Sequence, residues 1–182
     1  MSGDGQPSDA STLRIHATTV ALGSYAVILR GPSGAGKSDL ALRFLAGAGS
    51  LQAMGLAGGL AGGLAGSSQQ LQHEPARRLV ADDQTLLVAR NGCLTASAPA
   101  SLAGRIEVRG VGIIVVPCVP SAEVRLVVDL CAAAAVDRYP LDGETVSLLG
   151  CHVPLRRLEA FEASAPLKLA LLLATAISVG PQ

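Results

Sequence analysis

The sequence predicts an α/β fold with a large mixed β-sheet, and two observations support this prediction. First, a short apolar run at 26–29 precedes a glycine-rich loop at 31–38, and the segment 39–45 then shows helical periodicity. Second, strand-like segments recur along the rest of the chain, whereas helical segments are few. The length is typical of one domain, and we expect residues 12–182 to form it.

The N-terminal part of the chain leads into the glycine loop. Residues 1–11 are rich in Gly, Ser, Asp and Pro, and we expect them to be disordered. Residues 12–22 alternate loosely between apolar and polar side chains, which predicts a strand. Gly23 and Ser24 then turn the chain back into the apolar run at 26–29. The sequence therefore predicts a β-hairpin that feeds the loop.

The loop matches the phosphate-binding pattern G-x-x-x-x-G-K-[ST] at every fixed position. It consists of Gly31, Pro32, Ser33, Gly34, Ala35, Gly36, Lys37 and Ser38. In such loops, consecutive backbone N–H groups and the following helix N-terminus bind anionic oxygens. The lysine reaches the β- and γ-phosphates, and the serine hydroxyl ligates Mg²⁺. The pattern predicts a nucleotide site at this P-loop, and the alternative is a glycine-rich turn without a ligand.

A glycine-rich stretch follows the predicted helix. Residues 55–66 repeat the tetrapeptide Gly-Leu-Ala-Gly, and each glycine disfavours a helix by about 1 kcal/mol relative to Ala. We interpret residues 47–75 as a flexible insertion, with a lid over a nucleotide as the alternative.

The second half of the chain is rich in predicted strands. They cover residues 77–81, 84–90, 93–98, 105–117, 124–130 and 146–153. Asn91 and Gly92 predict a hairpin turn, and residues 137–140 a loop. Pro166 opens a last helix that we expect to lie in the core.

Composition narrows the class of partner and the compartment. The chain carries 14 basic and 14 acidic residues, so nothing favours nucleic acid or a membrane surface as a partner. No uninterrupted apolar run reaches the roughly 18 residues of a membrane span. The four cysteines lack metal-site spacing, and we expect buried thiols in a reducing, cytoplasmic compartment.

Candidate metal and proton-transfer groups follow two predicted strands. Asp82 and Asp83 end the strand at 77–81, where one carboxylate could bind Mg²⁺ and the other accept a proton. A solvated loop after a strand is the alternative. On the strand 105–117, Glu107 is a candidate Mg²⁺ ligand and Arg109 a candidate clamp for phosphoryl charge. A cross-strand ion pair explains these two equally well.

Three stretches of the sequence resemble the catalytic domain of HPr kinase/phosphorylase. They are the P-loop with Asp39-Leu40-Ala41-Leu42, the segment Arg78-Leu79-Val80-Ala81-Asp82-Asp83, and Ile106-Glu107-Val108-Arg109-Gly110-Val111-Gly112-Ile113-Ile114. The third stretch is close to the signature of the family. The resemblance covers roughly residues 12–158, apart from the glycine-rich insertion. This bacterial enzyme uses ATP to phosphorylate a serine of the phosphocarrier protein HPr, and it removes the phosphate by phosphorolysis.

The resemblance implies a role for several residues. Lys37 resembles the P-loop lysine of the family and Ser38 its Mg²⁺ ligand. Asp83 resembles the carboxylate that accepts the serine proton, with Asp82 near the metal and Glu107 as a second Mg²⁺ ligand. His16 and Arg138, which are weak signals alone, resemble an active-site histidine and arginine. ATP, Mg²⁺, an HPr-like protein and inorganic phosphate are the implied ligands, and the implied assembly is a homo-oligomer, a hexamer. The implied core is similar to that of phosphoenolpyruvate carboxykinase.

The chain departs from the family pattern in three places. The family often carries a separate N-terminal domain, whereas we expect the catalytic core here to begin near residue 12. The glycine repeat interrupts the usual path from the P-loop helix to Asp82. The late Pro-Gly-Arg-Asn segment of the family is replaced by residues 153–158, which keep Arg156 and Arg157 but no Gly or Asn. We therefore expect phosphorolysis to be weaker, relative to the kinase reaction, than in the full-length family. The alternatives to a serine kinase are a small-molecule kinase, a carboxykinase relative, and an ATP-binding regulator without catalysis.

Overall fold

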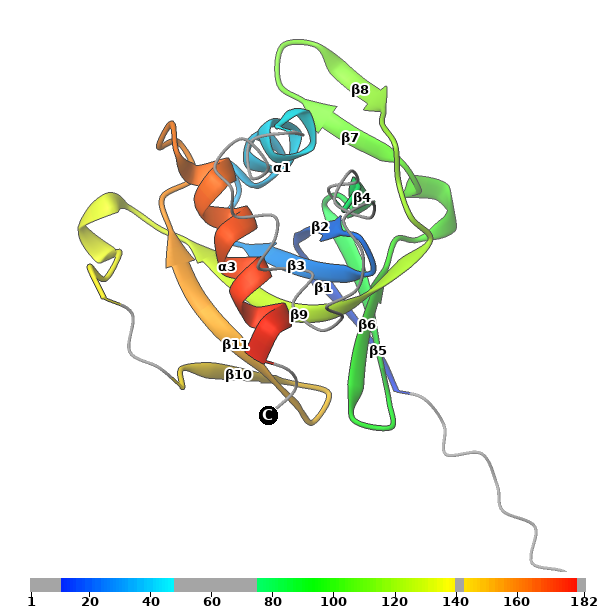
Figure 1. Cartoon of the computed structure of the whole chain (residues 1–182). Coiled ribbons are helices and arrows are strands. Elements are labelled where there is room, and N and C mark those ends of the chain that lie inside the picture. Colours follow the sequence, from blue (N-terminus) through cyan, green and yellow to red (C-terminus); the bar gives the residue numbers. More distant parts are fainter. Residues whose placement is uncertain (1–10, 48–74, 140–142, 180–182) are drawn as a thin grey trace, which may run out of the picture.

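A computed structural model describes residues 11–47, 75–139 and 143–179 (Figure 1). The predicted disordered terminus at 1–11 and the predicted flexible insertion at 47–75 lie outside the described residues, apart from their border positions. In chain order the strands and helices are β1 (Thr12–His16), β2 (Thr18–Leu22), β3 (Tyr25–Arg30), α1 (Lys37–Ala46), β4 (Arg77–Ala81), β5 (Gln84–Arg90), β6 (Cys93–Ser97), the short 3₁₀ helix η2 (Ala100–Leu102), β7 (Arg105–Val108), β8 (Gly112–Val115), β9 (Ser121–Leu130), the short 3₁₀ helix η3 (Ala133–Ala135), β10 (Thr145–Leu148), β11 (Cys151–Leu158) and α3 (Ala165–Val179).

The main sheet is mixed, as the sequence predicted. Its strands follow the order β1-β5-β6-β9-β3-β2-β4, and β11 pairs with β9 and β10. Strand β9 pairs in parallel with both β3 and β11, whereas the remaining pairs in this sheet are antiparallel. The predicted hairpins are present, because β2 pairs with β3 across Gly23 and β5 pairs with β6 across Asn91 and Gly92.

Two short connections force this sheet to curl. Strand β1 is at one end of the strand order and β2 is near the other, yet Ala17 alone links them. Strand β4 is last in the order and β5 is second, and only Asp82 and Asp83 join them. The twist of the sheet must therefore bring its two ends together. We call the place where they meet, at Ala17 and at Asp82 and Asp83, the seam of the sheet. At this seam the Ala17 N–H donates to the Asp83 carbonyl at 3.2 Å.

Both faces of the central strands are buried. Along β3, Val27 and Leu29 pack toward α1 and α3, while Ala26 and Ile28 face the opposite cluster. This explains why β3 reads as a continuous apolar run rather than an alternating one. The cluster opposite the helices is rich in small side chains, which the tight inner surface of a curled sheet requires: Ala17, Ala21, Ala26, Ala96 and Ala122.

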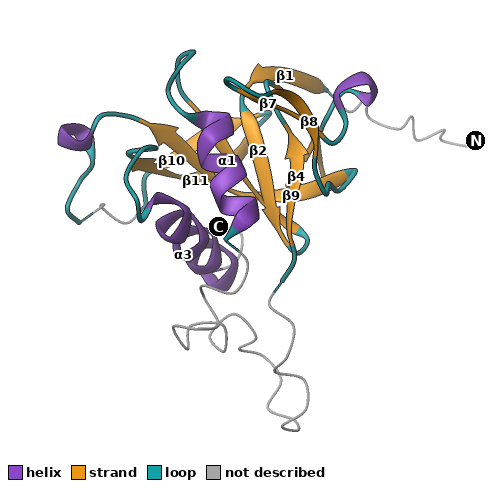
Figure 2. Ribbon diagram, turned by 90° about the horizontal axis from the view of Figure 1, so that it is seen from above, coloured by secondary structure: helices purple, strands orange, loops and turns teal. Residues whose placement is uncertain are grey.

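The helices cover one face of the sheet and lie side by side (Figure 2). Helix α1 buries Leu40 and Phe44, and α3 buries Leu169 and Leu173, all at helical spacing on the side that meets the sheet. The predicted last helix is thus a core helix. No helix in the described part of the chain is both long enough and apolar enough to cross a membrane.

The structure corrects several predictions. Residues 12–22 form two strands because the chain crosses the seam at Ala17. Residues 146–153 likewise divide between β10 and β11, with a turn at Leu149 and Gly150. The expectation of buried thiols is wrong, because Cys93 and Cys118 are exposed and the other two cysteines are partly buried.

The segment 105–117 is a hairpin, not a single strand. Strands β7 and β8 pair with each other in a separate two-stranded sheet. Gly110 and Gly112 adopt φ values of 84° and 110°, which glycine tolerates and which turn the chain between the strands. Side chains of the apolar run, including Val111 and Val115, are exposed rather than buried.

Candidate active site

The glycine loop lies between β3 and α1, as the motif predicted. Gly36 is the N-cap of α1 with a φ of 87°, and it offers no side-chain acceptor to the first N–H groups of the helix. A Cβ at this position would lie 2.8 Å from the Ala160 Cβ, so both the backbone conformation and the space require glycine. The helix start is therefore open to an anion, which is how P-loops hold phosphate.

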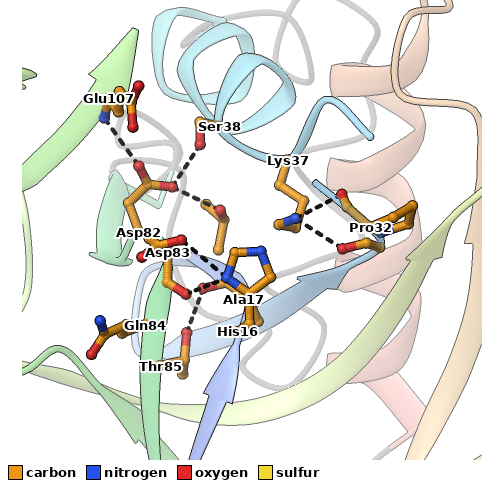
Figure 3. Close-up of polar contacts among 12 residues, drawn as sticks. His16, Ala17, Pro32, Lys37, Ser38, Asp82, Asp83, Gln84, Thr85 and Glu107 are labelled. Carbon is orange, nitrogen blue, oxygen red and sulfur yellow. Dashed lines mark hydrogen bonds and ion pairs between the residues drawn. The ribbon is translucent and has the colours of Figure 1, made fainter. Parts of the chain in front are cut away.

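Lys37 folds back over the loop. Its Nζ donates to the Gly31 carbonyl at 2.8 Å and to the Pro32 carbonyl at 3.0 Å (Figure 3). The residue is buried, and these two carbonyls satisfy the ammonium group where water reaches it poorly. A phosphate in the loop would therefore compete with backbone carbonyls for this charge.

Asp82 connects three parts of the fold at the seam. Its Oδ1 accepts hydrogen bonds from the Thr18 hydroxyl at 2.7 Å and from the Ser38 hydroxyl at 2.8 Å. Its Oδ2 accepts the Glu107 backbone N–H at 3.0 Å, and the residue is buried (Figure 3). The carboxylate thus links helix α1 to β2 and to the β7–β8 hairpin. Its three hydrogen-bond donors replace the water that it loses on burial.

Asp83 and His16 form a pair that faces solvent. Asp83 has a φ of 64°, a conformation that Asp adopts more readily than most residues. The His16 Nδ1 lies 3.0 Å from the Asp83 Oδ1 and 3.1 Å from the Asp83 carbonyl oxygen. Because both of these Asp83 oxygens are hydrogen-bond acceptors, the geometry places a proton on the His16 Nδ1. Both side chains are more than half exposed, so the pair is accessible to a reactant.

These groups line one pocket of about 390 Å³. The size falls within the range of about 300–1,000 Å³ that is usual for small-molecule sites. The predicted site residues in its lining are His16, Ser33, Gly34, Gly36, Lys37, Ser38, Asp83, Glu107 and Arg109. Asp82 lies behind Ser38 and reaches the pocket through that hydroxyl. Gly31, Pro32 and Ala35 do not line it, although the first two hold Lys37.

The few oxygen ligands of this pocket fit an Mg²⁺ ion that is shared with a bound phosphate. They fit a metal ion held by protein side chains alone less well. Within the described residues, no group of three or more His, Cys, Asp or Glu side chains could hold a metal ion. Ser38 and Asp82 nevertheless place a hydroxyl and a carboxylate 2.8 Å apart, and Glu107 lines the same pocket. Mg²⁺ prefers hard oxygens and keeps several waters, so it needs only one or two protein ligands beside phosphate.

Arg138 lies elsewhere. It lines a second pocket of about 200 Å³ together with Arg156 and Arg157, and it is absent from the lining of the first pocket. Arg157 donates to the Glu144 carboxylate at 2.9 and 2.6 Å, and this hydrogen-bonded charge raises the pKa of the guanidinium. Arg138 and the two β11 arginines, Arg156 and Arg157, therefore lie together away from the glycine loop, whereas Arg109 lines the first pocket.

Five residues of the first pocket were not predicted as site residues. Asp39, Leu42 and Val108 belong to the motif stretches, whereas Thr18 and Phe161 belong to none of them. Thr18 sits in the fully buried strand β2, where a hydroxyl needs a partner, and this could have drawn attention to it. Phe161 is one of only two phenylalanines in the chain, yet it is exposed. Its predecessor Ala160 contacts the position where a Gly36 side chain would be. Thus residues 160–161, rather than Arg156 and Arg157, bring the late segment to the P-loop.

Comparison with known proteins places a solved structure beside this geometry. No family model matches the sequence, and no curated protein matches it. The solved structure of the Hpr(Ser) kinase/phosphatase from Coxiella burnetii matches with a TM-score of 0.59 and 25% sequence identity. The match covers 91% of this chain and 93% of that chain.

The chain has an HPr kinase-like catalytic domain. The similarity confirms the resemblance and the fold class: a curled mixed sheet with α1 and α3 on one face. Because the relative is a kinase/phosphatase, the similarity also supports an enzyme of the phosphotransferase kind.

Proposed function

We propose that the chain is an ATP- and Mg²⁺-dependent kinase that phosphorylates a serine of an HPr-like phosphocarrier protein. One observation supports this most strongly: Ser38, held by Asp82, and Asp83, held by His16, line a single pocket beside the glycine loop. A nucleotide-binding element and a proton acceptor are the two parts that phosphoryl transfer to a hydroxyl requires. The structural similarity to an Hpr(Ser) kinase/phosphatase supports the choice of protein substrate.

The loop and Lys37 bind the phosphates of ATP in this proposal. Lys37 exchanges the Gly31 and Pro32 carbonyls for β- and γ-phosphate oxygens, a short movement at the end of a flexible side chain. Arg109 contacts developing charge on the transferred group. Ser38, Asp82 and Glu107 would hold Mg²⁺, which neutralises phosphate charge when bound.

Asp83 receives the proton of the substrate serine. As the serine oxygen bonds to the γ-phosphorus, the bond from that phosphorus to the β,γ-bridging oxygen breaks and ADP leaves. The proton passes from the serine hydroxyl to the Asp83 carboxylate. His16 holds this carboxylate through its Nδ1 and orients it toward the pocket. The pair thereby performs the role that a catalytic-loop aspartate has in other kinases.

The same pocket limits the reverse reaction. In phosphorolysis, inorganic phosphate must bind beside phosphoserine, and cations must offset the repulsion between the two anions. Among the described residues, Lys37 and Arg109 are the Lys and Arg side chains that line the pocket, because Arg156 and Arg157 line the other one. We therefore propose that phosphorolysis is slower relative to the kinase reaction than in the family.

The test is to incubate the protein with labelled ATP, Mg²⁺ and the HPr-like protein of the same organism, and to identify phosphoserine by mass spectrometry. Lys37→Met keeps the aliphatic stem but removes the charge, and we expect it to lower turnover about 10²–10³-fold. ATP consumption with a small molecule but no phosphoserine would instead indicate a small-molecule kinase. ATP binding without any transfer would indicate a regulator. Either result would refute the proposed function.

A further inference from the structure

Phe161 is an exposed aromatic side chain at the rim of the first pocket. About 66% of its surface is accessible, although Phe is usually among the more buried residue types. Its ring lies directly beside the loop, because a Cβ at Gly36 would be only 3.0 Å from the Phe161 Cζ. The chain therefore leaves a large apolar ring in contact with the phosphate-binding loop and open to solvent.

The backbone that carries this ring is fixed on both sides. Arg43 of α1 donates to the carbonyls of both neighbours of Phe161, a short hydrogen bond to Ala160 and one of 3.3 Å to Glu162. Asp39 holds the same guanidinium through a 2.9 Å hydrogen bond. The ring is thus exposed on a held segment, and its exposure is a property of the fold.

The far side of the segment is anchored to the last helix. Glu162 accepts Lys168 at 2.5 Å and the Ser164 hydroxyl at 2.8 Å. These hydrogen bonds, with the Lys168 charge, lower the pKa of the Glu162 carboxyl. Both α1 and α3 therefore position residues 160–162, and they present the ring of Phe161 to the pocket.

We propose that Phe161 is the stacking surface for the base of the bound nucleotide. This inference rests on the proposed function, since it assumes that the loop holds the phosphates. A base has a flat π-face and an aromatic side chain stacks on it without hydrogen bonds, so a rigid exposed ring beside a phosphate site fits a nucleobase. Phe161 lies beside Gly36 of the loop, so a nucleotide whose phosphates the loop holds is the reactant that we assign to this ring.

The absence of tryptophan from the sequence allows a direct test. In Phe161→Trp the new side chain is the only tryptophan, and its fluorescence reports on stacking. We expect Mg·ATP to quench the emission and inorganic tripolyphosphate, which has no base, to leave it nearly unchanged. Tyr139→Trp is the matched control, because Tyr139 is exposed and does not line this pocket. Its emission should not respond to either compound.

Affinity measurements complete the test. By calorimetry, Phe161→Ala should bind Mg·ATP about 5- to 150-fold more weakly, which corresponds to about 1–3 kcal/mol of base stacking, and bind tripolyphosphate as the wild type does. Phe161→Tyr should restore ATP affinity. If Phe161→Ala binds ATP normally, or only its KM for the protein substrate rises, the inference is wrong while the proposed function stands. If the wild type binds neither ATP nor tripolyphosphate, the proposed function fails as well.

Discussion

Removing the Asp82 carboxylate should destabilise the fold and abolish activity together. In Asp82→Ala the Thr18 hydroxyl loses its 2.7 Å acceptor in a fully buried position, which costs about 2 kcal/mol. The Ser38 hydroxyl and the Glu107 N–H are only partly buried, so water replaces the acceptor at about 0.75 kcal/mol each. The total is about 3.5 kcal/mol, or a fall in Tm of about 7–14 °C for a chain of this size.

Asp82→Asn separates the structural role from the electrostatic one. Its amide oxygen can accept the Glu107 N–H, while its NH₂ group donates to the Thr18 and Ser38 hydroxyls, which rotate to accept. We therefore expect a loss of stability of about 1 kcal/mol or less, but a large loss of turnover because the negative charge is gone. Thr18→Val is the matched control: it removes one hydrogen bond, about 1–2 kcal/mol, and leaves the charge in place.

The measurements are urea denaturation of each variant without ligand and the phosphoserine assay with Mg·ATP. Removing Asp82 also removes the desolvation cost of its buried charge, which raises the free energy of unfolding, whereas the lost hydrogen bonds lower it. If Asp82→Ala proves as stable as the wild type, the burial cost outweighs the three donors and the reasoning is refuted. Full activity in Asp82→Asn would show that its charge is not needed.

Two further predictions concern the other carboxylate and the arginines. Asp83→Asn should slow phosphoryl transfer about 10²–10⁴-fold and change ATP affinity little, because an amide cannot accept the serine proton. If ATP affinity collapses while turnover at saturating ATP is kept, Asp83 is a metal ligand instead. Arg109→Ala should reduce kcat more than Arg138→Ala does, because Arg109 lines the first pocket and Arg138 the second. Equal or reversed losses in steady-state kinetics would contradict this placement.

The parts of the fold that local sequence specifies were predictable. The glycine loop lies between β3 and α1, the Asn91-Gly92 turn joins β5 to β6, and the two carboxylates follow β4. Each of these depends on residues close together in the chain, whose turn chemistry and periodicity act locally.

Features set by distant contacts were not predictable in this way. Nothing at Ala17 marks a strand break, which arises because the sheet curls there. The apolar residues of β8 resemble a buried strand, but β8 pairs only with β7 and its Gly112 and Val115 are exposed. The place of Arg138 follows from how its loop packs on β11, and the pattern around it carries no such information.

The seam of the sheet also determines when in folding the site can exist. The contacts that assemble it join residues far apart in the chain: Thr18 and Asp82 are 64 positions apart, and His16 and Asp83 are 67 apart. Long-range contacts form late because loop closure must precede them. The strand, loop and helix over residues 25–46 are adjacent in sequence, whereas the carboxylates join them only when the sheet closes. Under the proposed function, phosphoryl transfer therefore requires the closed sheet.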